Sequence, residues 1–264
     1  MKYDSIVREK TPEPDTVDYH LWLLAAAAEI LLVLLVLPLL LVYTIYFHDG
    51  FAWDASEPYY TMFNVHPLCM VIGFIILYSQ GVLTYRVLRK LPKFAAKVIH
   101  AALMLSVLVF AVVGLVAVFK FHNKQNMPNL YSLHSWLGLT TVILFGFQYL
   151  AGFTLYLLPL PFIPQFYRDY SKSSHRTLGL VIYILATVCV LTGLQEKIGF
   201  GLEYSKHNCK VRSTTNSTCV TEYKYQDKPP EGIVLNVLGF SICFSAILVV
   251  AIAIQSSWRR QPDN

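Results

Sequence analysis

Charge is what this sequence has least of. Only 14% of its 264 residues are charged and 55% are hydrophobic, whereas a soluble chain carries roughly 25% charged residues. The formal net charge of +5 is small, and no basic run is interleaved with aromatic residues, so a nucleic acid is not expected as a partner. No motif repeats along the chain, and there is no room for a separate soluble domain. The composition therefore indicates a membrane protein.

Cysteine and histidine spacings typical of zinc sites are also missing, so none of the five cysteines is expected to bind zinc. Three of them lie inside apolar runs and are read as small buried hydrophobes: Cys69, Cys189 and Cys243. The other two, Cys209 and Cys219, flank the glycosylation sequon at Asn216 in the one long polar loop. This arrangement predicts a glycan and a local disulfide in an oxidising compartment. Two free thiols are the alternative.

Six apolar stretches are long enough to cross about 30 Å of hydrocarbon at about 1.5 Å per residue. They cover residues 21–47, 60–83, 94–119, 130–158, 174–198 and 233–258. The first is too long for the apolar region of a signal peptide and has no small-residue cleavage site, so it is read as an uncleaved span. The expected fold is an all-α integral membrane protein with six transmembrane helices.

The basic residues predict the orientation. The connection after the second span is rich in Lys and Arg, and basic residues also follow the fourth and sixth spans, whereas the connection after the first span has none. The positive-inside rule then places both termini in the cytoplasm. The expected organisation is a cytoplasmic segment at 1–20, a membrane domain at 21–258 with a lumenal loop at 199–232, and a cytoplasmic tail at 259–264.

Four of the eight histidines form a pattern. One lies near the start of each of the second to fifth spans: His66, His100, His134 and His175. Because consecutive spans run in opposite directions, His66 and His134 are expected near the outer face, and His100 and His175 near the inner face. In an up-and-down four-helix bundle these partners lie diagonally and can face each other across the core.

Two imidazoles that face each other in an apolar core suit an iron porphyrin with both axial positions filled, whose natural chemistry is electron transfer. A histidine-lined carrier or channel for a metal ion or protons is the alternative. It predicts Asp or Glu beside the histidines, and the interiors of the second to fifth spans contain neither.

Several motifs resemble those of the cytochrome b561 family of ascorbate-dependent transmembrane oxidoreductases. The most specific are FNVHPLCM at 63–70 and NLYSLHSWLG at 129–138. LTYRVLRK at 83–90, KVIHAAL at 97–103, LVAVFKFHN at 115–123, SSHRTLG at 173–179 and PPEGIVLNVLG at 229–239 also match. SSHRTLG departs from the sequence that relatives often have around this histidine, although the histidine itself stays aligned.

The resemblance implies a central four-helix bundle of the second to fifth spans, two non-covalent haem b groups and a homodimer. By motif position, His66 and His134 would hold the outer haem iron, and His100 and His175 the inner one. The family carries electrons from cytoplasmic ascorbate to an acceptor across the membrane. Monodehydroascorbate and ferric iron, as a ferric chelate, are equally expected as that acceptor. The membrane could be that of endosomes, lysosomes or secretory vesicles, or the plasma membrane.

The same motifs imply two substrate sites. Arg86, Lys93, Lys97 and Arg168 match the family's cytoplasmic ascorbate site, where cations would bind the ascorbate monoanion. The alternative is that these charges only set the topology. On the outer side, His122, Asn123 and Tyr131 resemble residues of the acceptor site, and Lys120 could add charge there.

Overall fold

The computed structural model describes residues 14–53, 60–158, 164–199 and 229–258. Within these ranges it contains six helices long and apolar enough to cross a membrane, at Tyr19–Phe47, Thr61–Val87, Lys93–Lys124, Leu133–Leu157, Gln165–Ile198 and Pro230–Ile254. Each corresponds to one of the apolar stretches in the sequence. The predicted all-α membrane fold with six spans is confirmed.

Each span is one continuous helix, and three of the six contain segments of wider, π-helical winding. The first span consists of α1 (Pro14–Glu29), η1 (Ile30–Val36), α2 (Leu37–Leu41) and η2 (Val42–Phe47). The second consists of α3 (Tyr60–Phe63), α4 (Val65–Met70), η3 (Val71–Leu77) and α5 (Tyr78–Val87). The remaining elements are α6 (Lys93–Lys124), α7 (Leu133–Gly152) with η4 (Phe153–Leu157), α8 (Gln165–Ile198), α9 (Pro230–Ile254) and η7 (Ser256–Trp258).

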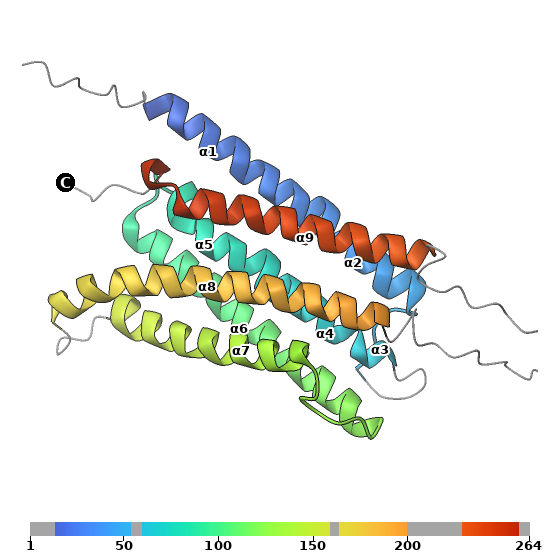
Figure 1. The fold of residues 1–264 in the computed structure, drawn as a ribbon. Helices are drawn as coiled ribbons and strands as arrows, with labels where there is room; N and C mark the ends of the chain where they lie inside the picture. Colours follow the sequence, from blue (N-terminus) through green and yellow to red (C-terminus); the bar gives the residue numbers. More distant parts are fainter. Residues whose placement is uncertain (1–13, 54–59, 159–163, 200–228, 259–264) are drawn as a thin grey trace, which may run out of the picture.

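The helices alternate in direction (Figure 1). α1 begins and α9 ends at the same end of the molecule, which is also where α5 leads into α6 and where α8 begins. The described residues at this end include eight lysines and arginines, and it is called the basic end below: Arg86, Arg89, Lys90, Lys93, Lys97, Arg168, Lys172 and Arg176. The described helix ends next to the second–third and fourth–fifth connections therefore lie at this same end.

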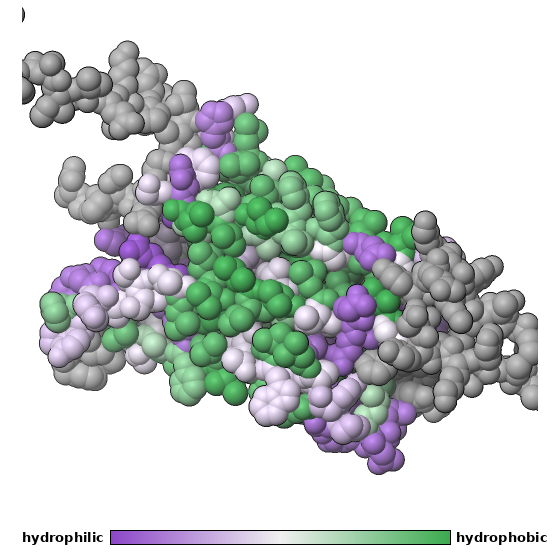
Figure 2. Space-filling view, in the orientation of Figure 1, coloured by the Kyte–Doolittle hydropathy of each residue, from purple (hydrophilic) through white to green (hydrophobic). Residues whose placement is uncertain are grey.

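The first and sixth spans pack along one side of the bundle formed by the other four. α9 contacts α1, η1, α5 and α8, while α7 packs on α8 and the second span packs on α6. Hydrophobic side chains cover the middle of the face shown in Figure 2, and hydrophilic ones gather towards both ends. Large apolar residues such as Val109, Phe240 and Ile247 are exposed in the chain alone, as expected of surfaces that face lipid.

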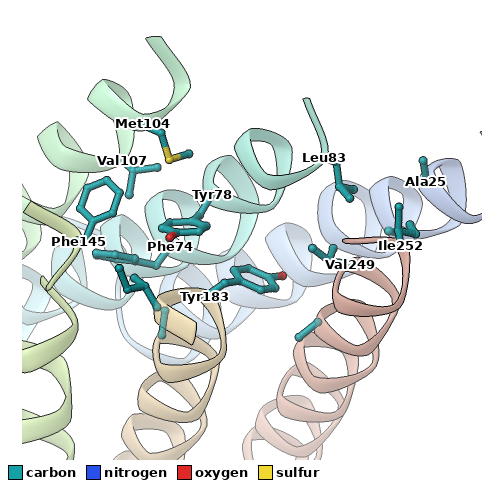
Figure 3. Close-up of a cluster of buried hydrophobic side chains, with 14 of the residues drawn as sticks. Ala25, Phe74, Tyr78, Leu83, Met104, Val107, Phe145, Tyr183, Val249 and Ile252 are labelled. Carbon is teal, nitrogen blue, oxygen red and sulfur yellow. The ribbon is translucent and has the colours of Figure 1, made fainter. Parts of the chain in front are cut away.

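Aromatic side chains fill the centre of the bundle (Figure 3). The rings of Phe74 and Phe145 lie 5.3 Å apart, and those of Tyr78 and Tyr183 lie 5.7 Å apart. The Tyr78 hydroxyl donates a 2.8 Å hydrogen bond to the carbonyl oxygen of Gly179, so this buried polar group is satisfied. The packed core therefore fixes the helices that carry the histidines relative to one another.

One boundary differs clearly from the sequence expectation. α8 begins at Gln165, nine residues before the predicted start at 174, so His175 lies about three turns inside the helix. The extra turns contain Tyr167, Arg168 and Asp169 among other polar residues. A span predicted from hydropathy ends where the apolar residues end, but the backbone hydrogen bonds of the helix continue beyond that point.

Candidate functional site

The four intramembrane histidines form two facing pairs. The ring centres of His66 on α4 and His134 on α7 lie 6.3 Å apart. Those of His100 on α6 and His175 on α8 lie 6.4 Å apart. The second pair lies towards the basic end, whereas the first lies towards the opposite end, which is called the outer end below. These are the two pairs that the alternating depths in the sequence predict.

Local structure positions the outer pair. His134 lies in the first turn of α7, whose start is fixed by a reciprocal cap between Ser132 and Ser135. The Ser132 side chain accepts a hydrogen bond from the Ser135 amide at 3.2 Å, and the Ser132 amide donates to the Ser135 hydroxyl at 3.1 Å. Such a cap satisfies amides that the first helical turn leaves unpaired. It therefore fixes the backbone from which His134 projects.

Three of the four imidazoles are oriented by backbone carbonyls of a neighbouring helix. Nδ1 of His66 donates to Gly114 at 3.0 Å, Nδ1 of His100 to Gly81 at 2.9 Å, and Nδ1 of His134 to Cys189 at 2.9 Å. A carbonyl oxygen can only accept, so the proton must be on Nδ1. Nε2 then carries a lone pair and is free to bind a metal. Histidines that bind metals usually have this arrangement, in which the other ring nitrogen donates to a partner that orients the ring.

Two glycines, which have no side chain, leave room for one histidine ring of each pair. A Cβ atom at Gly193 would lie 2.7 Å from Cε1 of His134, and a Cβ at Gly152 would lie 2.7 Å from Cε1 of His175. These separations are shorter than any ordinary carbon–carbon contact. One ring of each pair therefore packs directly on helix backbone, where a larger residue would displace it.

The spacing and chemistry of each pair fit a haem iron. Two metal–imidazole bonds of about 2 Å each, together with the radii of the two rings, separate the ring centres by about 6 Å. The observed 6.3 and 6.4 Å agree with this separation. Both pairs offer neutral nitrogen donors in an apolar surrounding, which suits bis-histidine iron coordination. Within the described ranges, no cluster of three or more His, Cys, Asp or Glu forms an alternative metal site.

A cavity of about 780 Å³ opens beside the inner pair. Its lining includes His100 and His175 and three residues of the predicted ascorbate site, Arg86, Lys93 and Lys97. The Arg86 guanidinium donates to backbone carbonyls at the end of the sixth span, and Lys97 Nζ donates to the Tyr156 carbonyl at 3.1 Å. The structure thus gathers cations and the inner histidines around one space.

The donor-side prediction was incomplete. Lys172 and Arg176 line the same cavity, and their spacing of three residues before and one after His175 could have indicated them. Lys172 also pairs with Asp169 at 2.6 Å. Arg168, in contrast, is not among the described residues that line the cavity. Arg168 nevertheless lies two helical turns before His175 on the same face of α8 and interacts electrostatically with Lys97, so its place in the ascorbate site stays a prediction.

The four residues predicted for the outer acceptor site make three separate contacts. Nδ1 of His122 donates to the Asn129 amide oxygen at 3.2 Å, and the Asn129 amide donates to Asn123 at 2.9 Å. Lys120 Nζ lies 5.2 Å from the centre of the Trp53 ring. Tyr131 is hydrogen-bonded to Glu196, and partial burial together with this carboxylate raises the pKa of the Tyr131 hydroxyl. Only His122 and Asn123 are joined, through Asn129.

Sequence reasoning missed Glu196. Its carboxylate accepts a 3.3 Å hydrogen bond from the Ser132 hydroxyl, and it lines a second cavity, of about 410 Å³, beside His134. The predicted Cys209–Cys219 disulfide and the Asn216 glycan lie outside the described residues.

Comparisons with known proteins agree with this architecture. The sequence profile of eukaryotic cytochrome b561 matches residues 65–201. A lysosomal membrane ascorbate-dependent ferrireductase of Danio rerio is 38% identical over 219 residues, which cover 81% of this chain and 80% of that protein. A transmembrane ascorbate-dependent reductase of Mus musculus is 36% identical over 214 residues, covering 81% of this chain and 76% of that protein.

A third relative, a plasma membrane ascorbate-dependent reductase of Xenopus laevis, is 35% identical over 226 residues, covering 85% of this chain and 72% of that protein. The profile match contains all four paired histidines, and the relatives align over most of their own length. This chain therefore belongs to the eukaryotic cytochrome b561 family.

Proposed function

We propose that this protein is a transmembrane oxidoreductase that takes electrons from ascorbate at its basic end and passes them, through two haem b groups, to an acceptor at its outer end. The observation that carries the proposal is the presence of two facing histidine pairs in one bundle, with a cationic cavity beside one of them. The relatives are named as ascorbate-dependent reductases, which supports the same activity.

His66 and His134 would hold the outer haem, and His100 and His175 the inner one. Each bound haem would supply a one-electron ferric–ferrous couple without an open coordination position. The protein's own contribution is orientation. The Nδ1 hydrogen bonds of His66, His100 and His134 keep these rings in the tautomer that presents Nε2. Packing against Gly193 limits the movement of the His134 ring, and packing against Gly152 limits that of the His175 ring.

The part of the cavity that lies against the basic residues is the proposed donor site, and the part between His100 and His175 would hold the inner haem. Ascorbate is a monoanion at neutral pH, and on giving up one electron and one proton it becomes monodehydroascorbate. Arg86, Lys93 and Lys97 line the cavity next to His100 and would attract and orient this anion through charge-assisted hydrogen bonds. Lys172 and Arg176 add to the positive potential of the same space. Arg168, which interacts electrostatically with Lys97, would add to the same positive potential.

The acceptor and the membrane are proposed from the relatives and from the charges. Because the Danio rerio relative is named a lysosomal ferrireductase, we propose ferric iron in the outer compartment as the acceptor, with monodehydroascorbate as the other candidate. The contacts of His122, Asn123 and Tyr131 lie towards the outer end, where this acceptor would bind. The Lys and Arg residues at the basic end favour a cytoplasmic placement of that end and of residues 1–20 and 259–264. The resemblance to the family also leads us to propose a homodimer.

Reconstituted vesicles test the function. Purified protein would be inserted into liposomes loaded with ascorbate, and ferric citrate would be added outside together with a ferrous-specific chelator. We expect coloured ferrous chelate to form in these vesicles, and little to form in vesicles loaded with buffer or carrying His134→Ala. A haem-free protein that moves metal ions or protons without reducing iron would instead identify a histidine-lined carrier.

A further inference from the structure

Lys197 places a cation close to the outer histidine pair, yet neither proposed substrate site includes it. It lies in the last turn of α8 and is partly buried. Its Nζ lies 4.9 Å from the centre of the Phe63 ring, which in turn lies 6.3 Å from the centre of the His66 ring. Even if these two distances lay end to end, Nζ would be no farther than about 11 Å from the His66 ring, a range over which charges interact inside a protein.

The position of Lys197 on α8 also brings it close to the outer pair. Gly193 packs on the His134 ring, and Lys197 follows it by four residues, so the two lie on one face of the helix, one turn apart. Lys197 therefore approaches the outer pair from the side of His134 as well as from the side of His66.

The charge of Lys197 is only partly compensated. The Glu231 carboxylate, in the first turn of α9, interacts electrostatically with Lys197. However, Oε1 of Glu231 also accepts a 2.9 Å hydrogen bond from Nε2 of His48, so this carboxylate is shared between two basic groups. Phe63 covers the ammonium with a ring face, which interacts favourably with a cation but does not neutralise it.

We propose that the positive charge of Lys197 raises the reduction potential of the outer haem. This inference rests on the proposed function, because it requires a haem between His66 and His134. Reduction adds one negative charge to the centre, and a nearby cation in a poorly screened interior stabilises the reduced form. The outer haem therefore accepts an electron more readily than it would without this charge, which favours electron transfer towards the outer end.

Redox titration of the purified protein tests the proposal. Haem absorbance would be followed against mediator dyes in the wild type, in Lys197→Gln and in Lys197→Arg. For a charge about 11 Å away at an effective dielectric constant of about 20, we expect Lys197→Gln to lower the equilibrium constant for reduction of one of the two haems by about tenfold. Lys197→Arg keeps the charge and should retain the wild-type titration.

The control is Lys124→Gln, which removes an exposed lysine at the end of α6 and should leave both haems unchanged because solvent screens that charge. If Lys197→Gln loses its outer haem, Glu231→Gln provides the test with the opposite sign, since removing the negative charge should ease reduction of the outer haem. The proposal is overturned if Lys197→Gln titrates like the wild type, if Lys197→Arg shifts as far as Lys197→Gln, or if Glu231→Gln makes reduction harder. A wild-type protein that binds no haem would instead overturn the proposed function.

Discussion

The contact between Gly193 and His134 gives the sharpest prediction about the outer haem. A Cβ at this position would lie 2.7 Å from Cε1 of the ring and 3.0 Å from its Nδ1. Carbon atoms in ordinary contact are separated by at least about 3.4 Å, so in Gly193→Ala the ring must retreat by about 0.7 Å. Nδ1 is held by a 2.9 Å bond to the Cys189 carbonyl, and the ring cannot retreat without disturbing that bond.

The energies decide the expected outcome. Alanine stabilises a helix by about 0.5–1 kcal/mol relative to glycine. Overpacking a well-packed site costs about 1–3 kcal/mol, and the strained hydrogen bond adds about 1 kcal/mol. The net loss is about 1–3.5 kcal/mol, less than the typical stability of a folded domain of about 5–15 kcal/mol, and it falls on the ring that would bind the iron. We therefore expect Gly193→Ala to fold and to keep the inner haem while losing most of the outer one.

The assay is haem per chain, from the absorbance of the reduced protein, with circular dichroism to confirm that the helices are intact. Gly152→Ala is the counterpart at His175, with the same 2.7 Å contact, and should lose the inner haem instead. Gly146→Ala is the matched control, because a Cβ there would meet nothing within 4 Å. If Gly193→Ala keeps two haems per chain with unchanged reduction potentials, the reasoning is refuted.

Two further predictions concern the donor site and the packing of the outer end. Lys97→Ala should raise the ascorbate concentration needed for half-reduction several-fold without changing haem content, because it removes a cation from the cavity beside His100. Lys90→Ala, at an exposed position, is the control. If Lys97→Ala and the wild type are half-reduced at the same ascorbate concentration, Lys97 only sets the topology. Asn64→Ala should destabilise the protein by about 2–3 kcal/mol, since the buried amide donates to the carbonyls of His48 at 2.9 Å and Gly50 at 2.7 Å. Thermal unfolding in detergent measures this loss, Ser106→Ala is the exposed control, and an unchanged unfolding temperature would contradict it.

The six spans were predictable because their signal is physical and local. Long apolar runs have only one way to satisfy their backbone groups in lipid, and that is to form helices. The pairing of the histidines also followed from the sequence, since alternating helix direction fixes the depth of each residue. His66 and His134 lie near the starts of two co-directional spans, and depth alone then leaves few possible partners.

The partners that orient the histidines could not be predicted. His66, His100 and His134 donate to backbone carbonyls of other helices. Every residue has a backbone carbonyl, so the sequence does not show which one accepts the hydrogen bond. The roles of Gly152 and Gly193 depend on close approach between helices, which no local pattern specifies. Glu196 was overlooked for a related reason, because its contact with Ser132 joins residues 64 positions apart.

The haem content of the purified protein tests the central claim most directly. The measurement is the number of haem b groups per chain, from the reduced absorbance spectrum, in the wild type, His134→Ala and His100→Ala. The two facing pairs predict two haems in the wild type and one in each variant, with the outer haem missing from His134→Ala and the inner haem missing from His100→Ala. A wild-type protein without haem, or single variants that keep both haems, would contradict the account.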